Sequence, residues 1–432
     1  MLSLDATAVN VALPGIGRTL GGTTAGLQWV VDAYTLMLAA LLISAGALSD
    51  RFGARRLFGI GLAAFMIASA GCGLAPALGL LIGGRAIQGS AAAVMLPASL
   101  ALVRQAFGDP VRRAKAIAQW SVGGAVAIAA GPVAGGVLTS AVSWRAIFFI
   151  NLPAGLMTLV LVARAPRSPR RAVPLDPAGQ VTAIAGLAAL TFGIIEGGAS
   201  GFGRPLVLGC LLLAAAAMGA FVLAEARAVH PMVPLRIFRS RTVTVCVAIG
   251  FAINVAFYGL IFVLSLYFQR ILGEPAVTAG LMFLPMTALL SSANLTSAKV
   301  AARFGPRLTI WTGLAVSALG MLALLACIGP DRLLLTAAMV PAGLGLGFAL
   351  PSLTVMLLDA IPADQAGLAA GMLNSSRQIG GTLAVAVFGV LVSHHADFVS
   401  GLRGSILIGA VMLLAATAAA LTLPVRPGAA GK

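Results

Sequence analysis

The sequence predicts an all-α membrane protein with fourteen transmembrane helices, and three observations support this fold class. The chain has 432 residues, of which 60% are hydrophobic and only 9% are charged. A soluble protein carries roughly a quarter charged residues. The apolar residues fall into runs of about 20, the length of helix that crosses a bilayer core of about 30 Å. The 52 glycines suit helices that pack closely in lipid.

The sequence contains fourteen apolar segments that are candidates for membrane spans. Their approximate bounds are 1–17, 27–49, 57–76, 78–102, 115–138, 145–163, 179–198, 204–224, 242–268, 276–298, 308–328, 333–357, 367–392 and 403–424. The first segment starts at Met1 and is shorter than a full crossing, so we expect a few further residues before it.

Basic residues cluster in alternate loops. The loops after even-numbered spans and the C-terminus hold 20 of the 28 Lys and Arg residues, for example in Arg51–Arg56 and Arg104–Lys115. By the positive-inside rule, both termini are cytoplasmic. The net charge of +16 therefore reflects topogenic charge beside anionic lipid and not nucleic-acid binding.

A short sequence occurs twice in the same topological place. Arg51-Phe52-Gly53-Ala54-Arg55 follows the second span, and Arg303-Phe304-Gly305-Pro306-Arg307 follows the tenth span, 252 residues later. Duplicated halves around a central site are a transporter architecture. We expect two six-helix bundles, residues 1–164 and 242–432, and a two-helix insert with its linkers, residues 165–241.

The loop after the second span combines small, acidic and basic residues. They are Gly46, Asp50, Arg51, Gly53, Arg55 and Arg56. A carboxylate at a helix end that faces several arginines forms charge-assisted contacts, which can hold two helices in one conformation. We interpret this loop as a conformational latch. The alternative is that its charges only orient the chain in the membrane.

Two charged residues lie within apolar spans and are candidates for proton coupling. Arg85 in the fourth span costs about 2.5–3.5 kcal/mol at the bilayer centre on insertion scales, so it needs a partner or water. Asp5 in the first span is costly when ionised and can gain and lose a proton near neutral pH. The alternatives are a structural ion pair for Arg85 and a permanently hydrogen-bonded Asp5.

Small residues recur every four positions in the fifth span, from Gly123 through Gly131 to Gly135. This spacing predicts a seam against which another helix packs closely. Pro132 predicts a kink, and Gly136 widens the seam. Packing alone explains the glycines, whereas the proline indicates a bend used in rocking.

Other polar side chains in the spans are weaker candidates. Those considered for lining a substrate cavity are Asn10, Gln88, Asn254, Tyr258 and Arg377. Asp32 and Glu196 lie near the outer ends of their spans, where an interfacial or paired role is the alternative.

Several catalytic signatures are absent from the sequence. It has no Gly-x-x-x-x-Gly-Lys-Ser/Thr loop, no Gly-x-Ser-x-Gly elbow and no metal-ligand spacing among its four cysteines. We therefore expect no enzymatic activity, no metal and no cofactor.

These motifs resemble those of the major facilitator superfamily, in particular the fourteen-spanner drug:proton antiporters. Gly46–Arg56 is similar to the loop after the second span. Leu81–Gly89 resembles the fourth-span motif, whose arginine is implicated in proton transfer. Gly131–Gly136 resembles the antiporter motif, and Leu4–Pro14 resembles the first-span motif of drug exporters. Trp144–Pro153 and Pro231–Phe238 are further matches, and Ala54 departs from a position that is often basic.

The resemblance implies a monomeric, multi-pass protein of the bacterial inner membrane. It would export amphipathic drugs in exchange for protons by alternating access. Its partners would be a small-molecule substrate, protons and membrane lipid. The main alternative is a carrier of the same fold that exports one metabolite or a self-made antibiotic. A membrane enzyme and a channel are disfavoured by the missing catalytic set and by the duplicated halves.

Overall fold

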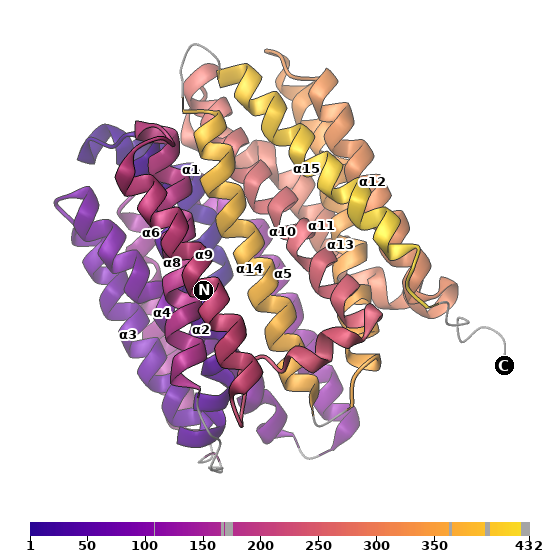
Figure 1. The fold of residues 1–432 in the computed structure, drawn as a ribbon. Coiled ribbons are helices and arrows are strands. Elements are labelled where there is room, and N and C mark those ends of the chain that lie inside the picture. The colour runs from indigo at the N-terminus through magenta and orange to yellow at the C-terminus, as the bar shows by residue number, and fades with distance from the viewer. Residues whose placement is uncertain (108, 166–167, 169–175, 363–364, 394–397, 425–432) are drawn as a thin grey trace.

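The computed structural model describes residues 1–107, 109–165, 168, 176–362, 365–393 and 398–424, which form a bundle of long helices (Figure 1). The α-helices are α1 (Leu2–Leu20), α2 (Thr24–Phe52), α3 (Ala54–Leu74), α4 (Leu78–Ala106), α5 (Pro110–Ala141), α6 (Ala146–Phe149), α7 (Asn151–Ala163), α8 (Pro177–Ser200), α9 (Pro205–Arg227), α10 (Arg241–Leu266), α11 (Ala276–Phe304), α12 (Pro306–Ala326), α13 (Arg332–Asp359), α14 (Ala366–Leu391) and α15 (Phe398–Ala420). A 3-10 helix, η1 (Leu235–Arg239), precedes α10, and a π-helical turn, η2 (Tyr267–Ile271), extends it.

In the part of the chain that the structure describes, twelve helices are long and apolar enough to cross a membrane. The prediction of fourteen spans is confirmed for these twelve segments only. The other two predicted segments, 1–17 and 367–392, form α1 and α14, which are not among the twelve. Polar residues lower their hydropathy: Asp5 and Asn10 lie in α1, and Arg377 and Gln378 lie in α14.

Two helix boundaries differ from the prediction for identifiable reasons. α5 begins before residue 115 because Asp109 caps it, accepting the Arg112 N–H at 2.9 Å. The segment 145–163 is divided between α6 and α7 at Ile150. Pro153 has no N–H to donate to a carbonyl four residues earlier, which favours a break at this position.

The duplicated loop sequence adopts the same local structure twice. Gly53 separates α2 from α3 with φ 88°, and Gly305 separates α11 from α12 with φ 87°. Positive φ is accessible to glycine at little cost, which explains why both loops carry this residue. The surrounding helices match as well, since α2 and α3 pack on α4 as α11 and α12 pack on α13.

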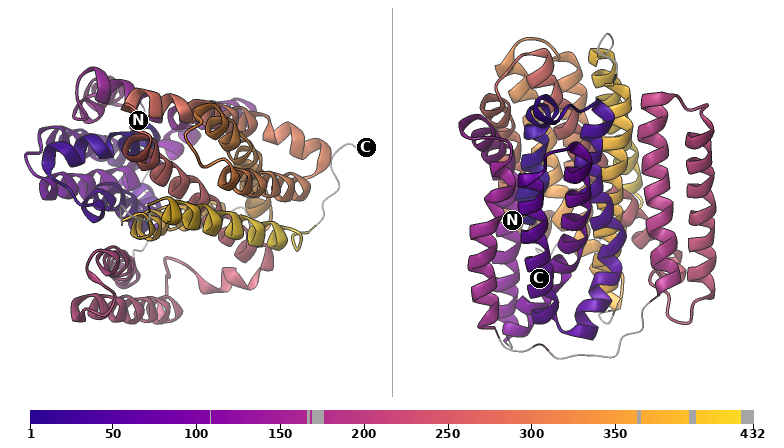
Figure 2. Two further views of the ribbon diagram at one scale, coloured as in Figure 1. Left: turned by 90° about the horizontal axis from the view of Figure 1, so that it is seen from above. Right: turned by 90° about the vertical axis from the view of Figure 1, so that its left-hand side faces the viewer.

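Helices α8 and α9 pack against each other at one side of the bundle (Figure 2). α8 also contacts α2 and α14. Near the end of α9, the buried Glu225 side chain accepts the Val233 N–H at 2.8 Å. This contact ties the insert to the segment that leads into α10.

The N-terminal half (α1–α7) and the C-terminal half (α10–α15) are held together by hydrogen bonds near the start of α2, in the middle of α1 and at the end of α10. Gln28 Nε2 donates to the carbonyls of Val385 at 3.1 Å and Ala386 at 2.7 Å. Ser265 Oγ donates to the Asn10 carbonyl at 2.8 Å. α5 and α11 also pack together, from Gly136 beside Ala276 to Ala125 beside Ser291, so contacts between the halves concentrate toward one end of the bundle.

Candidate functional site

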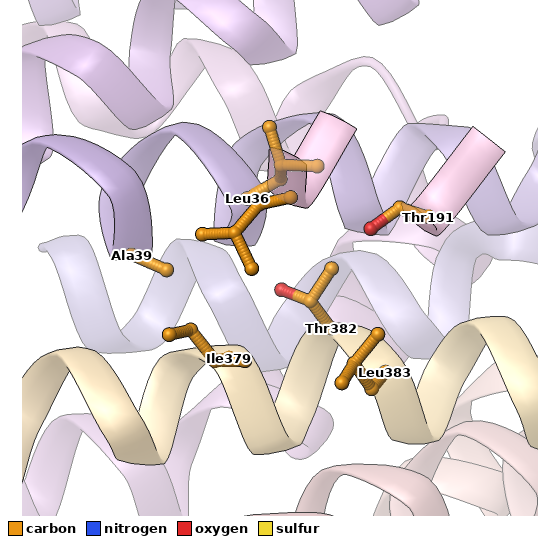
Figure 3. A pocket seen from close by; sticks show the side chains of 7 residues that line it. Leu36, Ala39, Thr191, Ile379, Thr382 and Leu383 are labelled. Carbon is orange, nitrogen blue, oxygen red and sulfur yellow. The ribbon is translucent and has the colours of Figure 1, made fainter. Parts of the chain in front are cut away.

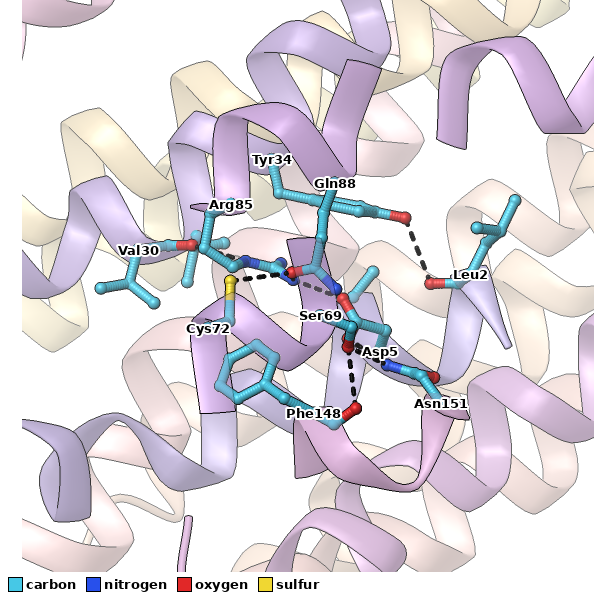
Figure 4. Close-up of polar contacts among 12 residues, drawn as sticks. Leu2, Asp5, Val30, Tyr34, Ser69, Cys72, Arg85, Gln88, Phe148 and Asn151 are labelled. Atoms are coloured by element: carbon cyan, nitrogen blue, oxygen red, sulfur yellow. Dashed lines mark hydrogen bonds and ion pairs between the residues drawn. The ribbon is translucent and has the colours of Figure 1, made fainter. Parts of the chain in front are cut away.

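The structure brings Asp5 and Arg85 together as an ion pair between α1 and α4 (Figure 4). Asp5 is 0% exposed and Arg85 is 1% exposed. Arg85 Nη1 donates to Asp5 Oδ2. A buried ion pair is strongly destabilised when one partner is removed, because the other charge is left uncompensated. Any change in the charge of Asp5 therefore acts directly on Arg85.

Arg85 is also held by neighbours that leave its orientation little freedom. Its Nε donates to the Val30 carbonyl at 3.0 Å, and its Nη1 donates to Gln88 Oε1 at 3.1 Å. The Tyr34 ring lies 4.3 Å from the guanidinium carbon, within cation–π range. These contacts come from α2 and α4, so Arg85 has partners on two helices in addition to Asp5.

The second carboxylate oxygen of Asp5 is held by α7 and, through it, by α3. Asn151 Nδ2 donates to Asp5 Oδ1 at 2.9 Å and lies 3.1 Å from Ser69 Oγ. Ser69 Oγ donates to the Phe148 carbonyl at 2.8 Å (Figure 4). Sequence reasoning named Asn151 within a motif but not as a site residue, and it missed Ser69. An amide within an apolar run was the available signal for Asn151.

Asp32 on α2 is a second buried carboxylate, and its setting differs from the predicted interfacial or paired role. It is 0% exposed. Neither carboxylate oxygen has a hydrogen-bond partner among the described residues. Its neighbours one turn away, Gln28 and Thr35, both reach α14, the latter through Thr382 at 2.9 Å. An ionised carboxylate without partners is strongly disfavoured in such a setting.

The five candidate cavity residues do not form one group. Gln88 belongs to the Arg85 cluster. Asn10 donates through Nδ2 to the Ala6 carbonyl of its own helix at 3.1 Å. Asn254, Tyr258 and Arg377 gather between α10 and α14, where Arg377 Nε donates to Asn254 Oδ1 at 3.2 Å.

Two pockets lie outside these clusters, where α8 meets α2 and α14. The first is a gap lined by Leu36, Ala39, Leu187, Thr191, Ile379, Thr382 and Leu383, and it is too narrow for a water molecule (Figure 3). The second has a volume of about 220 Å³, and its lining includes Thr23, Gln28, Ile195 and Val390. Neither is lined by Asp5, Arg85 or Arg377.

The predicted latch loop has few polar contacts. Asp50, Arg51 and Arg56 are exposed, and Asp50 forms no ion pair within the described ranges. Arg55 Nη2 donates to the Ala163 carbonyl at 2.6 Å, which links the loop to the end of α7. A Cβ added to Gly46 would meet open space. The latch function of this loop stays a prediction.

Comparison with known proteins identifies the family. The profile described as Major Facilitator Superfamily matches residues 1–385 and, in a second match, residues 292–432. The chain belongs to the major facilitator superfamily.

Individual relatives agree with this assignment. The chain is 34% identical to the "Methylenomycin A resistance protein" of Bacillus subtilis, over all of this chain and 93% of that protein. It is 36% identical to the "Tetracenomycin C resistance and export protein" of Streptomyces glaucescens, over 91% of this chain and 74% of that protein. The fold is similar to that of the xylose transporter XylE from E. coli in a partially occluded inward-open conformation. The TM-score is 0.68 at 13% identity, with 100% of this chain and 96% of that chain covered.

The glycines of the fifth predicted span divide into two sets in this major facilitator. Gly131 and Gly135 face α1, where a Cβ on Gly135 would lie 2.5 Å from the Ala8 carbonyl oxygen. Gly136 faces the Ala276 backbone at the start of α11. Gly123 has no neighbour within 4 Å of an added Cβ, so the predicted seam is wrong for that position. Among these glycines, close packing begins at Gly131, beside Pro132.

Proposed function

We propose that this major facilitator exports amphipathic small molecules in exchange for protons by alternating access, and that Asp5 carries the proton. The observation that best supports this proposal is the buried ion pair of Asp5 with Arg85. Asp5 lies on α1, the helix that also contacts the C-terminal half. The Asn10 and Val11 carbonyls of α1 accept hydrogen bonds from Ser265 and Gln269 at 2.8 and 2.9 Å. Asp5 lies about one and a half turns from these contacts. Protonation of Asp5 would thus loosen a helix that takes part in closing the halves.

The arrangement of contacts supports an inward-facing state for this conformation. With both termini cytoplasmic, the hydrogen bonds of Gln28, Ser265 and Gln269 lie on the extracytoplasmic side. Toward the cytoplasmic ends, a Cβ on Gly46, Gly123 or Gly371 would meet open space. In such a state the central region exchanges molecules with the cytoplasm.

In the proposed transport cycle, Asp5 binds and releases one proton. When the protein faces outward, a proton binds an Asp5 carboxylate oxygen and the ion pair with Arg85 is lost. Arg85 stays on Val30 and Gln88, and α1 is free to shift as the protein turns inward. The proton then leaves to the cytoplasm, the ion pair re-forms and substrate binds. Each proton that moves inward supplies roughly 2.3 kcal/mol per 100 mV of membrane potential.

We also propose that α1 and α14 cross the membrane, which gives fourteen spans. α1 is 19 residues long and α14 is 26 residues long. α1 packs on α5, and α14 packs on α10 and α2. Their polar residues therefore face other helices, where polar groups in a membrane are tolerated. The two six-helix bundles, residues 1–164 and 242–432, would rock about this interface, with residues 165–241 as the insert.

The names of the relatives favour antibiotics as substrates. Methylenomycin A and tetracenomycin C are therefore the first compounds to test. The alternative is an exporter that is specific for one metabolite or self-made antibiotic. A panel of unrelated dyes separates the two, since a multidrug exporter moves several and a specific exporter moves at most one.

The test is proton-coupled uptake into inverted membrane vesicles that contain the protein. With the wild-type protein, adding a transported compound releases protons from the vesicle lumen into the medium. We expect Asp5→Asn to abolish this release. Asp331→Asn is a matched control, because Asp331 caps α13 at 3.1 Å from the Leu334 nitrogen, and asparagine caps about equally well. Normal proton release by the Asp5→Asn variant would refute the role of Asp5.

A further inference from the structure

Arg377 on α14 is a guanidinium within a predicted span that lacks a carboxylate partner. Its Nε donates to Asn254 Oδ1 and its Nη1 donates to Asn374 Oδ1, both at 3.2 Å. The Tyr258 ring on α10 packs nearby, where a Cβ added to Gly381, one turn along α14 from Arg377, would lie 3.1 Å from Tyr258 Cδ2. Within the described ranges, no Asp or Glu forms an ion pair with Arg377. Among the described residues, its positive charge therefore meets neutral amide oxygens and no carboxylate.

The other intramembrane arginine shows the contrast. Arg85 is neutralised by Asp5 and is 1% exposed. Arg377 is only partly buried, which leaves a side open to another molecule. A cation in a membrane-embedded region requires a counter-charge, water or a ligand. The two asparagines orient the guanidinium but leave its charge uncompensated.

Arg377 lies on a polar stripe of α14. Asn374, Arg377 and Gln378 are all partly exposed and share one side of the helix with Gly367 and Gly371. A Cβ on Gly367 or Gly371 would meet no atom within 4 Å. A lipid-facing stripe would be apolar, so this stripe faces the central region between the halves. Further along α14, Thr382 contacts Thr35 of α2, where the halves close.

We propose that Arg377 binds an anionic group, such as a carboxylate, of the transported molecule. This inference rests on the proposed export function and specifies the substrate class. A guanidinium presents paired N–H donors that match a carboxylate, and its amide neighbours pre-orient it. Asn254 on α10 and Asn374 on α14 hold the guanidinium from two helices. An amphipathic monoanion would place its charge on Arg377 and its apolar body between the halves.

The experiment compares two xanthene dyes of opposite charge. Fluorescein carries a carboxylate, whereas rhodamine 6G has this group esterified and is cationic. Binding of each dye to purified protein in detergent is measured by fluorescence polarisation, for wild type, Arg377→Gln and Arg377→Lys. Arg204→Gln is the control, because it removes the same charge from an exposed residue at the start of α9. Transport of both dyes is then measured in inverted vesicles.

We expect the wild-type protein to bind fluorescein more tightly than rhodamine 6G. Arg377→Gln should weaken fluorescein binding by about tenfold or more, with rhodamine 6G unchanged or bound more tightly. The fluorescein affinity of Arg377→Lys should lie between those of wild type and Arg377→Gln, and that of Arg204→Gln should equal that of wild type. An equal loss of affinity for both dyes in Arg377→Gln would show that Arg377 has a structural role and would overturn the proposal. Equal wild-type affinity for the two dyes, or no binding of either, would overturn it as well.

Failure of this inference differs from failure of the export function. Proton release that depends on Asp5, together with transport that is indifferent to substrate charge, would leave the antiporter intact and remove the anion site. Selective fluorescein binding at Arg377 without proton release would support the anion site and remove the proton-antiport function.

Discussion

Thr35 on α2 and Thr382 on α14 join the two halves of the protein through a hydrogen bond of 2.9 Å between their hydroxyl oxygens. Both residues are buried, at 3% exposure each. They belong to the contact region that the inward-facing assignment places on the outer side. Their separation in an outward-facing state is a requirement of alternating access.

Cross-linking these two residues should stop transport. Cysteines at positions 35 and 382 would bring two sulfur atoms within bonding range, because the present oxygens are in contact. The background protein carries alanine at Cys72, Cys210, Cys246 and Cys327. We expect oxidation of the Thr35→Cys, Thr382→Cys protein to abolish transport and a reductant to restore it. Full transport by the oxidised, cross-linked protein would contradict alternating access at this interface.

Gly89 should tolerate alanine poorly. A Cβ on Gly89 would lie 2.9 Å from the Tyr34 Cα and would also strike the Tyr34 carbonyl, so α2 and α4 would have to separate. We expect Gly89→Ala to destabilise the protein by about 1–3 kcal/mol, seen as a lower midpoint of thermal unfolding in detergent. Gly83→Ala on the same helix is the control, since its Cβ would meet no atom within 4 Å. An equal response of the two variants would show that the α2–α4 contact is looser than described.

Arg85 should not be replaceable by lysine. Lysine keeps the charge for Asp5 but cannot also donate to Val30 and Gln88 with the geometry of a guanidinium. We expect Arg85→Lys to lower the transport rate by about tenfold or more while the protein still reaches the membrane. The measurement is initial uptake rate in vesicles, normalised to the amount of protein. Wild-type rates would show that only the charge of Arg85 matters.

The sequence identified Asp5 and Arg85 as charged residues in apolar spans and predicted that Arg85 needs a partner or water, but only the structure shows that they pair. The repeat of Arg51–Arg55 at Arg303–Arg307 predicted two related halves, and the structure shows that the two loops have the same glycine conformation. The sequence did not predict that Asn151 contacts Asp5 or that Ser69 contacts Asn151. Their contacts depend on how α3 and α7 are rotated, and lipid is as apolar as the protein interior, so hydropathy does not indicate which side of a helix faces inward.

Asp32 and Gly123 show the same limitation. The depth of Asp32 in its span is readable from the sequence, but its burial comes from the packing of α2 against neighbouring helices. Gly123 fits a four-residue seam with Gly131 and Gly135, yet α1 packs only along the later part of α5. The span count shows a related limit: hydropathy supports twelve spans among the described residues, because polar residues lower the hydropathy of α1 and α14.

The most direct test of the central claim is proton release by the purified protein when substrate binds. The protein is placed in weakly buffered detergent solution with a pH indicator, and a compound that wild type exports is added. We predict that wild type releases protons on binding, because binding favours the form in which Asp5 is ionised and paired with Arg85. Asp5→Asn should bind the compound without release, and Asp32→Asn should behave as wild type. Undiminished release by Asp5→Asn would contradict the account, and loss of release only in Asp32→Asn would move the proton site to Asp32.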